Sequence, residues 1–409
     1  MQKNRTHVEL PLSERSRLTF RYDTLRQIFQ GILETGVKTY VLLIAIRVFH
    51  MNALEKSLLS SSGFAGLLCA PIVMKWMAHT SWTSMQAASF YFFIVAGCFL
   101  AAAMTHHSGT YLALIVAARF IYKQQISIMI DVYGHNYAPS ERGAKLGCSM
   151  FFLATTSVLF SLLAGKWLDR HLEAYRWILF IIALSALGSA ISFLKIPSRK
   201  ILTNLGHHAL TNFSLLWKDK LFSAIIIIWA LEGIANQMTI PLRVEYVVSD
   251  RYGLCFSNHW AMLLTCVVPS LFRILSSKIW GHIFDRVSLV RMKLWINTTL
   301  LLGILFYFIP SSPFWILIGA CFIGIAYGGG VIAWSLWVTK IAPEETRCDY
   351  ASVSASEFGL RSFLSPFIGY ALLEWTQSLH CVVTIAAIMI SLSSIGFWCL
   401  RHHERLRSA

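Results

Sequence analysis

Charged residues are scarce in this chain, and their shortage excludes most classes of soluble protein. Only 13% of the 409 residues are Asp, Glu, Lys or Arg, and 56% are hydrophobic. A soluble domain usually carries about 25% charged residues. We therefore expect an all-α integral membrane protein that is surrounded by lipid.

Motifs of enzyme and metal chemistry are also missing. The nine cysteines form no CxxC pair and no spacing typical of a disulfide framework or a metal site, so we expect them to act as small apolar side chains. The sequence contains no nucleotide-binding loop, no cluster of metal ligands and no nucleophile triad. It therefore predicts no enzyme activity, no catalytic residue, no metal and no cofactor.

Long apolar runs are what the sequence has instead. A membrane-spanning helix needs roughly 20 mostly apolar residues. None of the runs resembles a cleaved signal peptide, because the stretch before residue 26 is polar and basic and the first run is too long. The sequence predicts twelve spanning helices, at about 26–49, 57–76, 84–104, 110–133, 147–168, 177–195, 221–247, 260–283, 289–309, 314–338, 350–375 and 381–400.

The formal net charge of +15 is explained by the links between these runs. With both termini in the cytoplasm, most Lys and Arg residues, including Lys293, fall on the cytoplasmic side, and few, including Lys56 and Arg243, on the outer side. This is the positive-inside distribution of membrane proteins, and no nucleic-acid site is needed. We expect a monomeric multi-pass membrane protein, located in the plasma (inner) membrane if the source is bacterial, with lipid and a small-molecule solute as its partners.

The two halves of the chain repeat each other. The Ala-Pro pairs that begin at Ala138 and Ala342 are separated by the same interval as Gly165 and Gly369, which indicates a parallel duplication. The predicted organisation is a cytoplasmic segment at 1–25, a six-helix bundle at 26–195, a cytoplasmic linker at 196–220, a second six-helix bundle at 221–400 and a cytoplasmic tail at 401–409.

A short charged link joins the eighth and ninth runs. Gly281 stands four residues before Asp285, so the two would share one helix face, and Arg286 and Arg291 follow. The glycine allows a neighbouring helix to come close, and the carboxylate can cap that helix or pair with an arginine. We interpret these four residues as a gate between two helices that must also separate.

These features together resemble the major facilitator superfamily over residues 26–400, and the link from Gly281 to Arg291 is similar to a cytoplasmic loop motif of that family. The resemblance implies two pseudo-symmetric six-helix bundles that rock about a central site. Gly165 and Asp169 repeat the motif's spacing on the opposite membrane face, as inverted repeats within each half would place them.

Charged residues inside the apolar runs indicate the candidate solute pathway, because a charge near the bilayer centre is costly unless it faces protein or water. The runs that line or flank the central cavity in that family supply the solute-binding candidates. When the charged candidates are counted together with Arg119 and Glu34, the cations outnumber the anions by two, which favours an anionic or zwitterionic solute. The candidates are Lys38, Lys123, Glu232, Asn236, Gln237, Arg273, Tyr327, Trp334, Glu357 and Arg361.

Glu34 and Arg119 are the candidate proton-coupling residues. Burial raises the pKa of a carboxyl group and a nearby cation lowers it, so a Glu34 that gains and loses a cation can bind and release a proton. Arg119 lies in a stretch that resembles the helix-four motif of the family and is the expected partner. Lys38 shares a helix face with Glu34, which leaves a purely structural ion pair as the alternative. Sodium is the alternative coupling ion.

Three consecutive glycines, Gly328, Gly329 and Gly330, lie in the tenth run. Each weakens a helix by about 1 kcal/mol relative to alanine. The cluster therefore predicts either a bending gate or close helix packing.

The function predicted from the sequence is secondary active transport of a small polar solute by rocker-switch alternating access, coupled to protons as a symporter or antiporter. The alternatives are a receptor or assembly partner that keeps the fold without transporting, and a proton-driven exporter of amphipathic compounds.

Overall fold

The computed structural model describes residues 11–80, 82–200, 214–342 and 347–407. Residues 1–10 of the expected N-terminal segment, 201–213 of the expected linker and 408–409 of the expected tail lie outside these ranges. Throughout the described ranges the chain is helical apart from short links and one isolated β-bridge between Thr83 and Lys200.

The first half of the chain forms one group of packed helices. Its long rods pack as α1 with α8 and α9, and α5 with α6 and α9. The helices are α1 (Leu12–Thr35), continued through a π-helical turn (Gly36–Tyr40) into α2 (Val41–Arg47), then α3 (Ala53–Leu68), α4 (Ala70–Ala78), α5 (Ser84–Met104), α6 (Ser108–Tyr122), α7 (Gln125–Asn136), α8 (Pro139–Arg170) and α9 (Tyr175–Leu194). We call this group the first bundle.

The second half forms a matching group, in which α15 packs on α13 and α14, and α11 packs on α16 and α17. Its helices are α10 (Leu215–Lys218), α11 (Lys220–Val248), α12 (Asn258–Met262), continued through a π-helical turn (Leu263–Val267) into α13 (Val268–Arg286), then α14 (Leu289–Phe308), α15 (Pro313–Ile341), α16 (Arg347–Thr376), α17 (Leu379–Cys399) and α18 (Glu404–Arg407). We call this group the second bundle.

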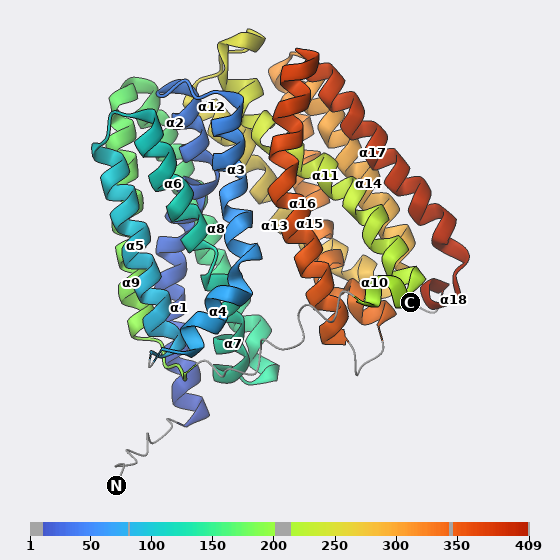
Figure 1. The fold of residues 1–409 in the computed structure, drawn as a ribbon, viewed down its shortest axis with the longest axis horizontal. Coiled ribbons are helices and arrows are strands. Elements are labelled where there is room, and N and C mark those ends of the chain that lie inside the picture. Colours follow the sequence, from blue (N-terminus) through green and yellow to red (C-terminus); the bar gives the residue numbers. More distant parts are fainter. Residues whose placement is uncertain (1–10, 81, 201–213, 343–346, 408–409) are drawn as a thin grey trace.

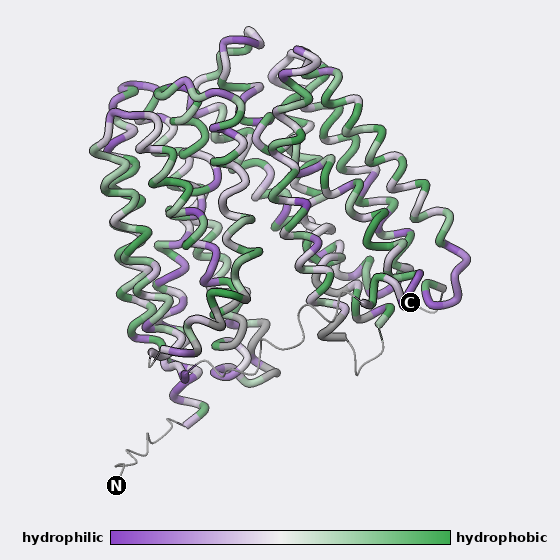
Figure 2. Tube along the Cα trace, in the orientation of Figure 1, coloured by the Kyte–Doolittle hydropathy of each residue, from purple (hydrophilic) through white to green (hydrophobic). Residues whose placement is uncertain are grey.

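The two bundles stand side by side and diverge toward the end of the molecule that carries both termini (Figure 1). We call this end the terminal end and the opposite one the far end. The bundles meet through α3 on α16, α8 on α12, and α2 on α11. Hydrophobic residues run along the lengths of the helices, and hydrophilic ones gather at both ends and at points between the bundles (Figure 2). This pattern fits a lipid-facing exterior with a polar interior.

Nine helical rods among the described residues are long and apolar enough to cross a membrane. The α1–α2 and α12–α13 pairs each count as one continuous rod. Two predicted runs are divided instead, at Cys69 between α3 and α4 and after Tyr122 between α6 and α7. Pro71 has no N–H group with which to continue the hydrogen-bond ladder of α3. The chain is therefore an all-α, multi-pass membrane protein.

The first rod begins well before the predicted boundary at residue 26. Helix α1 starts at Leu12, so most of the polar segment before residue 26 is helical rather than irregular. Its polar side chains have polar partners: Asn136 of α7 donates to Thr19 at 2.9 Å, and Arg26 pairs with Asp23 within α1 at 2.7 Å and donates to Gln125 of α7 at 3.0 Å. The sequence is polar here because these side chains face protein rather than lipid.

Candidate functional site

The far end of the molecule is held closed by a glycine and an aspartate of the first bundle. Asp169, near the end of α8, accepts hydrogen bonds from the backbone N–H groups of Asn258 and His259, the latter at 3.0 Å, and so caps the start of α12. A Cβ atom on Gly165 would lie 3.0 Å from the Cα of His259, so the glycine permits this close approach. The carboxylate also meets the positive end of the helix dipole.

Two cations, the buried Lys56 and the half-buried Arg47, strengthen the same contact. Lys56 of α3 pairs with Glu245 of α11 at 2.6 Å. Arg47 at the end of α2 donates to the side chain of Asn258 at 2.8 Å and to the carbonyl of Phe256. The sequence places Lys56 on the outer side, just before a run; in the structure it lies inside α3 at the far end, where its carboxylate partner on the other bundle draws it into the interface. We call the contacts of Arg47, Lys56 and Asp169 the far-end seal.

The link predicted as a gate lies at the terminal end and is not engaged in this conformation. A Cβ atom on Gly281 would meet nothing within 4 Å. Asp285, Arg286 and Arg291 are exposed, and none of them forms an ion pair within the part of the chain that the structure describes. The geometry expected here, a glycine at a close approach and a carboxylate capping a helix, is found instead at Gly165 and Asp169.

A cavity of about 500 Å³ lies between the two bundles. Among the described residues that line it, seven cationic side chains face a single carboxylate. Aromatic side chains complete the wall, Trp229 and Trp334 among them. The charged lining residues are Lys38, Arg119, Lys123, Arg243, Arg273, Lys293, Arg361 and Glu232.

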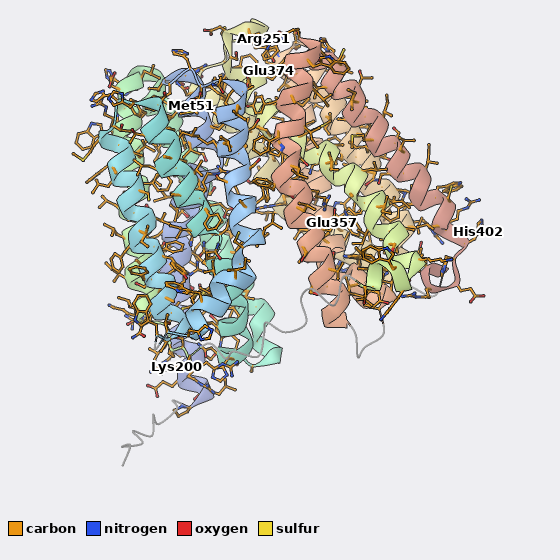
Figure 3. All side chains as sticks on the ribbon, in the orientation of Figure 1. Met51, Lys200, Arg251, Glu357, Glu374 and His402 are labelled. Atoms are coloured by element: carbon orange, nitrogen blue, oxygen red, sulfur yellow. The ribbon has the colours of Figure 1, made fainter. Side chains whose placement is uncertain are left out.

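Most of the predicted solute-binding residues meet at this cavity. Glu34, Glu357, Gly328 and Gly329 are not among its described lining residues. Glu357 lies on α16, well away from Arg251 and Glu374 at the far end (Figure 3). The predicted residues that do line the cavity are Lys38, Arg119, Lys123, Glu232, Asn236, Gln237, Arg273, Tyr327, Gly330, Trp334 and Arg361.

The expected pair between Glu34 and Arg119 is not formed. Glu34 bonds to Lys38, one turn along the same rod. Arg119 donates to two backbone carbonyls instead, those of Val37 and of Ser60, the latter at 3.1 Å. Val37 belongs to the π-helical turn, and such a turn leaves a carbonyl without its usual helical partner. The buried guanidinium supplies the missing donor.

Glu34 also interacts electrostatically with Lys123 of the first bundle and Arg273 of the second. Its surroundings therefore include a cation from each side of the cavity, and Arg273 belongs to the opposite bundle.

The single lining carboxylate, Glu232 on α11, pairs with Lys293 on α14 at 3.1 Å. The Lys293 side chain is 1% exposed, and its ammonium lies 4.2 Å from the centroid of the Trp229 ring. Lys293 was counted with the charges of the cytoplasmic side, but it is a buried residue of the helix interior. Helix α14 begins at Leu289, so Lys293 lies one turn inside the helix and faces inward, where a carboxylate and an aromatic ring compensate its charge.

Arg361 on α16 is fixed by a carboxylate, two rings and a glycine. It pairs with Glu357 at 2.9 Å and lies over the rings of Trp334 and Phe358. A Cβ atom on Gly233 would stand 1.0 Å from the Nη1 atom of Arg361. Gly233, which sequence reasoning missed, therefore makes the space in which the guanidinium lies.

Arg243 is the most informative residue that sequence reasoning missed. Its charge was counted on the outer side although the predicted run 221–247 contains it, and α11, which ends at Val248, keeps Arg243 inside the rod. Its guanidinium donates to Tyr327 at 2.7 Å, to Asn236 at 2.9 Å and to Thr239 at 2.8 Å. A usable signal existed, because a residue seven positions after Asn236 falls on the same helix face.

Two of the three glycines of the tenth run serve close helix packing in this conformation, whereas a Cβ atom on Gly330 would meet nothing within 4 Å. A Cβ atom on Gly328 would lie 3.0 Å from the backbone carbonyl oxygen of Arg273, and one on Gly329 would lie 2.8 Å from the Trp280 ring. Helix α15 runs unbroken through them. The bending gate stays a prediction.

Comparison with known proteins agrees with this architecture. A family model described as Major Facilitator Superfamily matches residues 27–366. A search of curated proteins finds no match to the sequence.

Solved transporters share the fold at low sequence identity. The nucleoside transporter NupG aligns with a TM-score of 0.73 at 13% identity, covering 95% of this chain and 100% of that one. A D-xylose-proton symporter aligns at 0.70 and 13% identity, covering 93% and 97%. The peptide transporter POT in complex with sulfate aligns at 0.70 and 12% identity, covering 98% and 99%. The chain belongs to the Major Facilitator Superfamily and is a membrane transporter rather than an enzyme.

Proposed function

We propose that this chain is a proton-coupled secondary transporter that moves a small anionic or zwitterionic solute by alternating access. In this proposal the nine long rods, together with α3–α4, α6–α7 and α16, make twelve crossings in two six-helix domains. Both termini lie in the cytoplasm. The observation that carries the proposal is the cavity between the bundles, with its seven cations and one carboxylate.

The conformation supports a rocking mechanism. The far-end seal joins the bundles through Asp169 and through the pair of Lys56 and Glu245. At the terminal end no helix packs closely against Gly281, because a Cβ atom there would meet nothing within 4 Å. With the termini in the cytoplasm this is an inward-facing state. Rocking would separate the far-end seal and bring the Gly281 link against the first bundle, which makes Gly281, Asp285, Arg286 and Arg291 gating residues of the opposite state.

Glu34 is the proposed proton-coupling residue, and Arg273 is the cation that changes its surroundings. Lys38 is on the same rod, so rocking of a rigid bundle leaves that pair intact. Arg273 is on the second bundle and moves relative to Glu34 when the bundles rock. A carboxylate that loses a nearby cation binds a proton more readily. Arg119 has a supporting role, since it holds the π-helical turn two residues beyond Glu34.

The excess of cations favours an anionic or zwitterionic solute. A buried cation needs a compensating charge, and a bound anion supplies it for those lining cations that lack a carboxylate. Tyr327 and Trp334 offer rings for a flat portion of the solute. The similar transporters carry a nucleoside, a sugar or a peptide by their names, and their low identity does not select among them.

Counterflow in proteoliposomes tests the proposal. Vesicles with the purified protein would be loaded with one unlabelled compound from a panel of carboxylates, phosphate esters and amino acids, and uptake of the same labelled compound would be followed. We expect exchange for at least one anionic or zwitterionic compound, and its uphill accumulation under an imposed proton gradient. Binding without exchange would contradict transport, and accumulation driven only by a sodium gradient would contradict proton coupling.

A further inference from the structure

The buried cations of the second bundle differ in how their charge is balanced. Lys293 has Glu232 at 3.1 Å, and Arg361 has Glu357 at 2.9 Å. Arg243 is as deeply buried, with 6% of its surface exposed, but no carboxylate pairs with it within the described ranges. Its partners are a phenol, an amide and a hydroxyl. A buried charge with only neutral partners is destabilising, because nothing compensates the loss of its hydration.

The hydrogen bonds around Arg243 leave some of its N–H donors unused, and they occupy the side-chain oxygen of Asn236, which accepts from both Arg243 and Tyr327. Three of the five N–H groups of a guanidinium are used by Tyr327, Asn236 and Thr239, and the Nε group is buried without a partner. Tyr327 in turn lies 3.2 Å from the Asn236 side-chain oxygen. That oxygen is therefore saturated, and the amide N–H₂ of Asn236 is left as a further donor on the cavity wall.

The cluster is also fixed in place before any solute arrives. Arg243, Asn236 and Tyr327 all line the cavity. Tyr307 donates to the backbone carbonyl of Arg243 at 3.3 Å and holds that turn of α11. A rigid group of donors around an uncompensated guanidinium is the arrangement by which proteins bind carboxylate and phosphate groups.

We propose that Arg243, positioned by Asn236, Thr239 and Tyr327, is the anchor for the anionic group of the transported solute, a carboxylate or a phosphate. This assignment rests on the proposed transport of an anionic or zwitterionic solute. Within the second bundle Lys293 and Arg361 each pair with a carboxylate, and for Arg243 the bound anion takes that place. The anchor belongs to one bundle, so the anion travels with that bundle when the protein rocks.

The substitution Asn236→Asp tests the anchor without knowledge of the solute. The new carboxylate would replace an oxygen that lies 2.9 Å from Nη2 of Arg243, and would give the guanidinium its missing counter-charge. We expect the melting temperature of the purified protein to rise. If the charge of Arg243 is already balanced, an added buried carboxylate would lower the melting temperature, and that result would overturn the inference.

Anion binding is measured on the same proteins by the thermal shift caused by sodium phosphate and by sodium succinate, with sodium chloride at equal ionic strength as the reference. We expect at least one of the two to stabilise the wild type, and the preferred one identifies the anionic group. Arg243→Gln and Asn236→Asp should each weaken its binding at least about tenfold, as expected for loss of a charge-assisted hydrogen bond. Arg251→Gln is the matched control, because Arg251 is exposed at the far end and bonds to Gln377.

Each outcome decides between the two proposals. If neither anion stabilises the wild type, or if Arg243→Gln binds as the wild type does, the anchor is wrong. If counterflow shows exchange of anions that Arg243→Gln leaves unchanged, the anchor fails while the proposed function stands. If the wild type exchanges only neutral or cationic compounds, the proposed function fails.

Discussion

The ion pair between Lys56 and Glu245 offers a direct test of the far-end seal. The two side chains are 11% and 7% exposed, and their charged atoms are 2.6 Å apart. Removing one partner of a buried ion pair costs about 3–5 kcal/mol, because the other charge stays buried and uncompensated. The partners lie on different bundles. In Lys56→Met the closed far end therefore keeps Glu245 buried without a cation, and separation of the bundles at that end relieves the cost by exposing the carboxylate to water.

The expected size follows from that cost. Since 1.4 kcal/mol is a factor of ten in an equilibrium constant, a loss of about 3 kcal/mol shifts the equilibrium toward an open far end on the order of 100-fold. Ser57 is a suitable reporter, because it is buried in the seal and donates to the carbonyl of Pro366 across the interface. In a background without other cysteines, alkylation of Ser57→Cys by a membrane-impermeant maleimide would report far-end opening.

We expect Lys56→Met to raise the alkylation rate strongly, and the charge swap of Lys56→Glu with Glu245→Lys to restore most of the protection. Lys145→Met is the matched control, because Lys145 pairs with Glu141 within a single helix, and rocking does not break that pair. An unchanged rate in Lys56→Met, or an equal rise in both variants, would refute the reasoning.

Three further predictions follow from the same contacts. Gly165→Leu should open the far end, because the leucine side chain would displace α12, whereas Gly281→Leu should leave the far end closed and hinder closure at the terminal end. Distances between spin labels at each end measure the two effects. Equal effects of the two substitutions would contradict the different roles of these glycines. Glu34→Gln should abolish proton-driven accumulation and spare exchange, and unchanged uphill uptake would remove Glu34 from the mechanism. Burial raises the pKa of Asp219, but hydrogen bonds from Arg405, the N–H of Phe222 and Tyr350 outweigh it, so the pKa lies below the ordinary 3.8. Asp219→Asn should therefore lower the melting temperature at neutral pH, and the difference from wild type should shrink as the pH falls below 3.8; a difference that persists in acid would contradict the lowered pKa.

The sequence predicts the helices well because lipid imposes a simple rule on composition. The sequence also predicts that a glycine and an aspartate cap a neighbouring helix. It places this contact at Gly281 and Asp285, whereas the structure shows it at Gly165 and Asp169. The two stretches have the same spacing, and which one is engaged depends on the conformation of the two bundles. A linear sequence carries no information on that choice.

The candidate site is predicted less completely, because charges near the ends of the apolar runs were counted with those of the two membrane sides. Lys56 lies just outside a predicted run, and Arg243 and Lys293 lie just inside theirs, but all three were counted in this way. The structure turns each of them inward, toward Glu245, Asn236 and Glu232 respectively. These partners come from other helices or from two turns away, so only the packed structure shows that the cavity is more cationic than the sequence indicates.

The pairing of Glu34 fails for a related reason. Helical spacing alone favours Lys38, and the expectation of Arg119 came from resemblance to a family motif. The π-helical turn at Gly36–Tyr40 creates a backbone acceptor that takes up Arg119, and such a turn has no signature in this sequence.

The proposed rocking mechanism requires reciprocal movement of the two ends, and pulsed electron–electron double resonance measures it directly. One pair of spin labels would replace Glu173 and Glu374 at the far end, and another would replace Arg17 and Arg286 at the terminal end, all exposed positions on opposite bundles. When a solute identified by counterflow is added, we expect the far-end distance to gain a longer population and the terminal-end distance to gain a shorter one. Distances that stay fixed at both ends, or that change at one end alone, would contradict it.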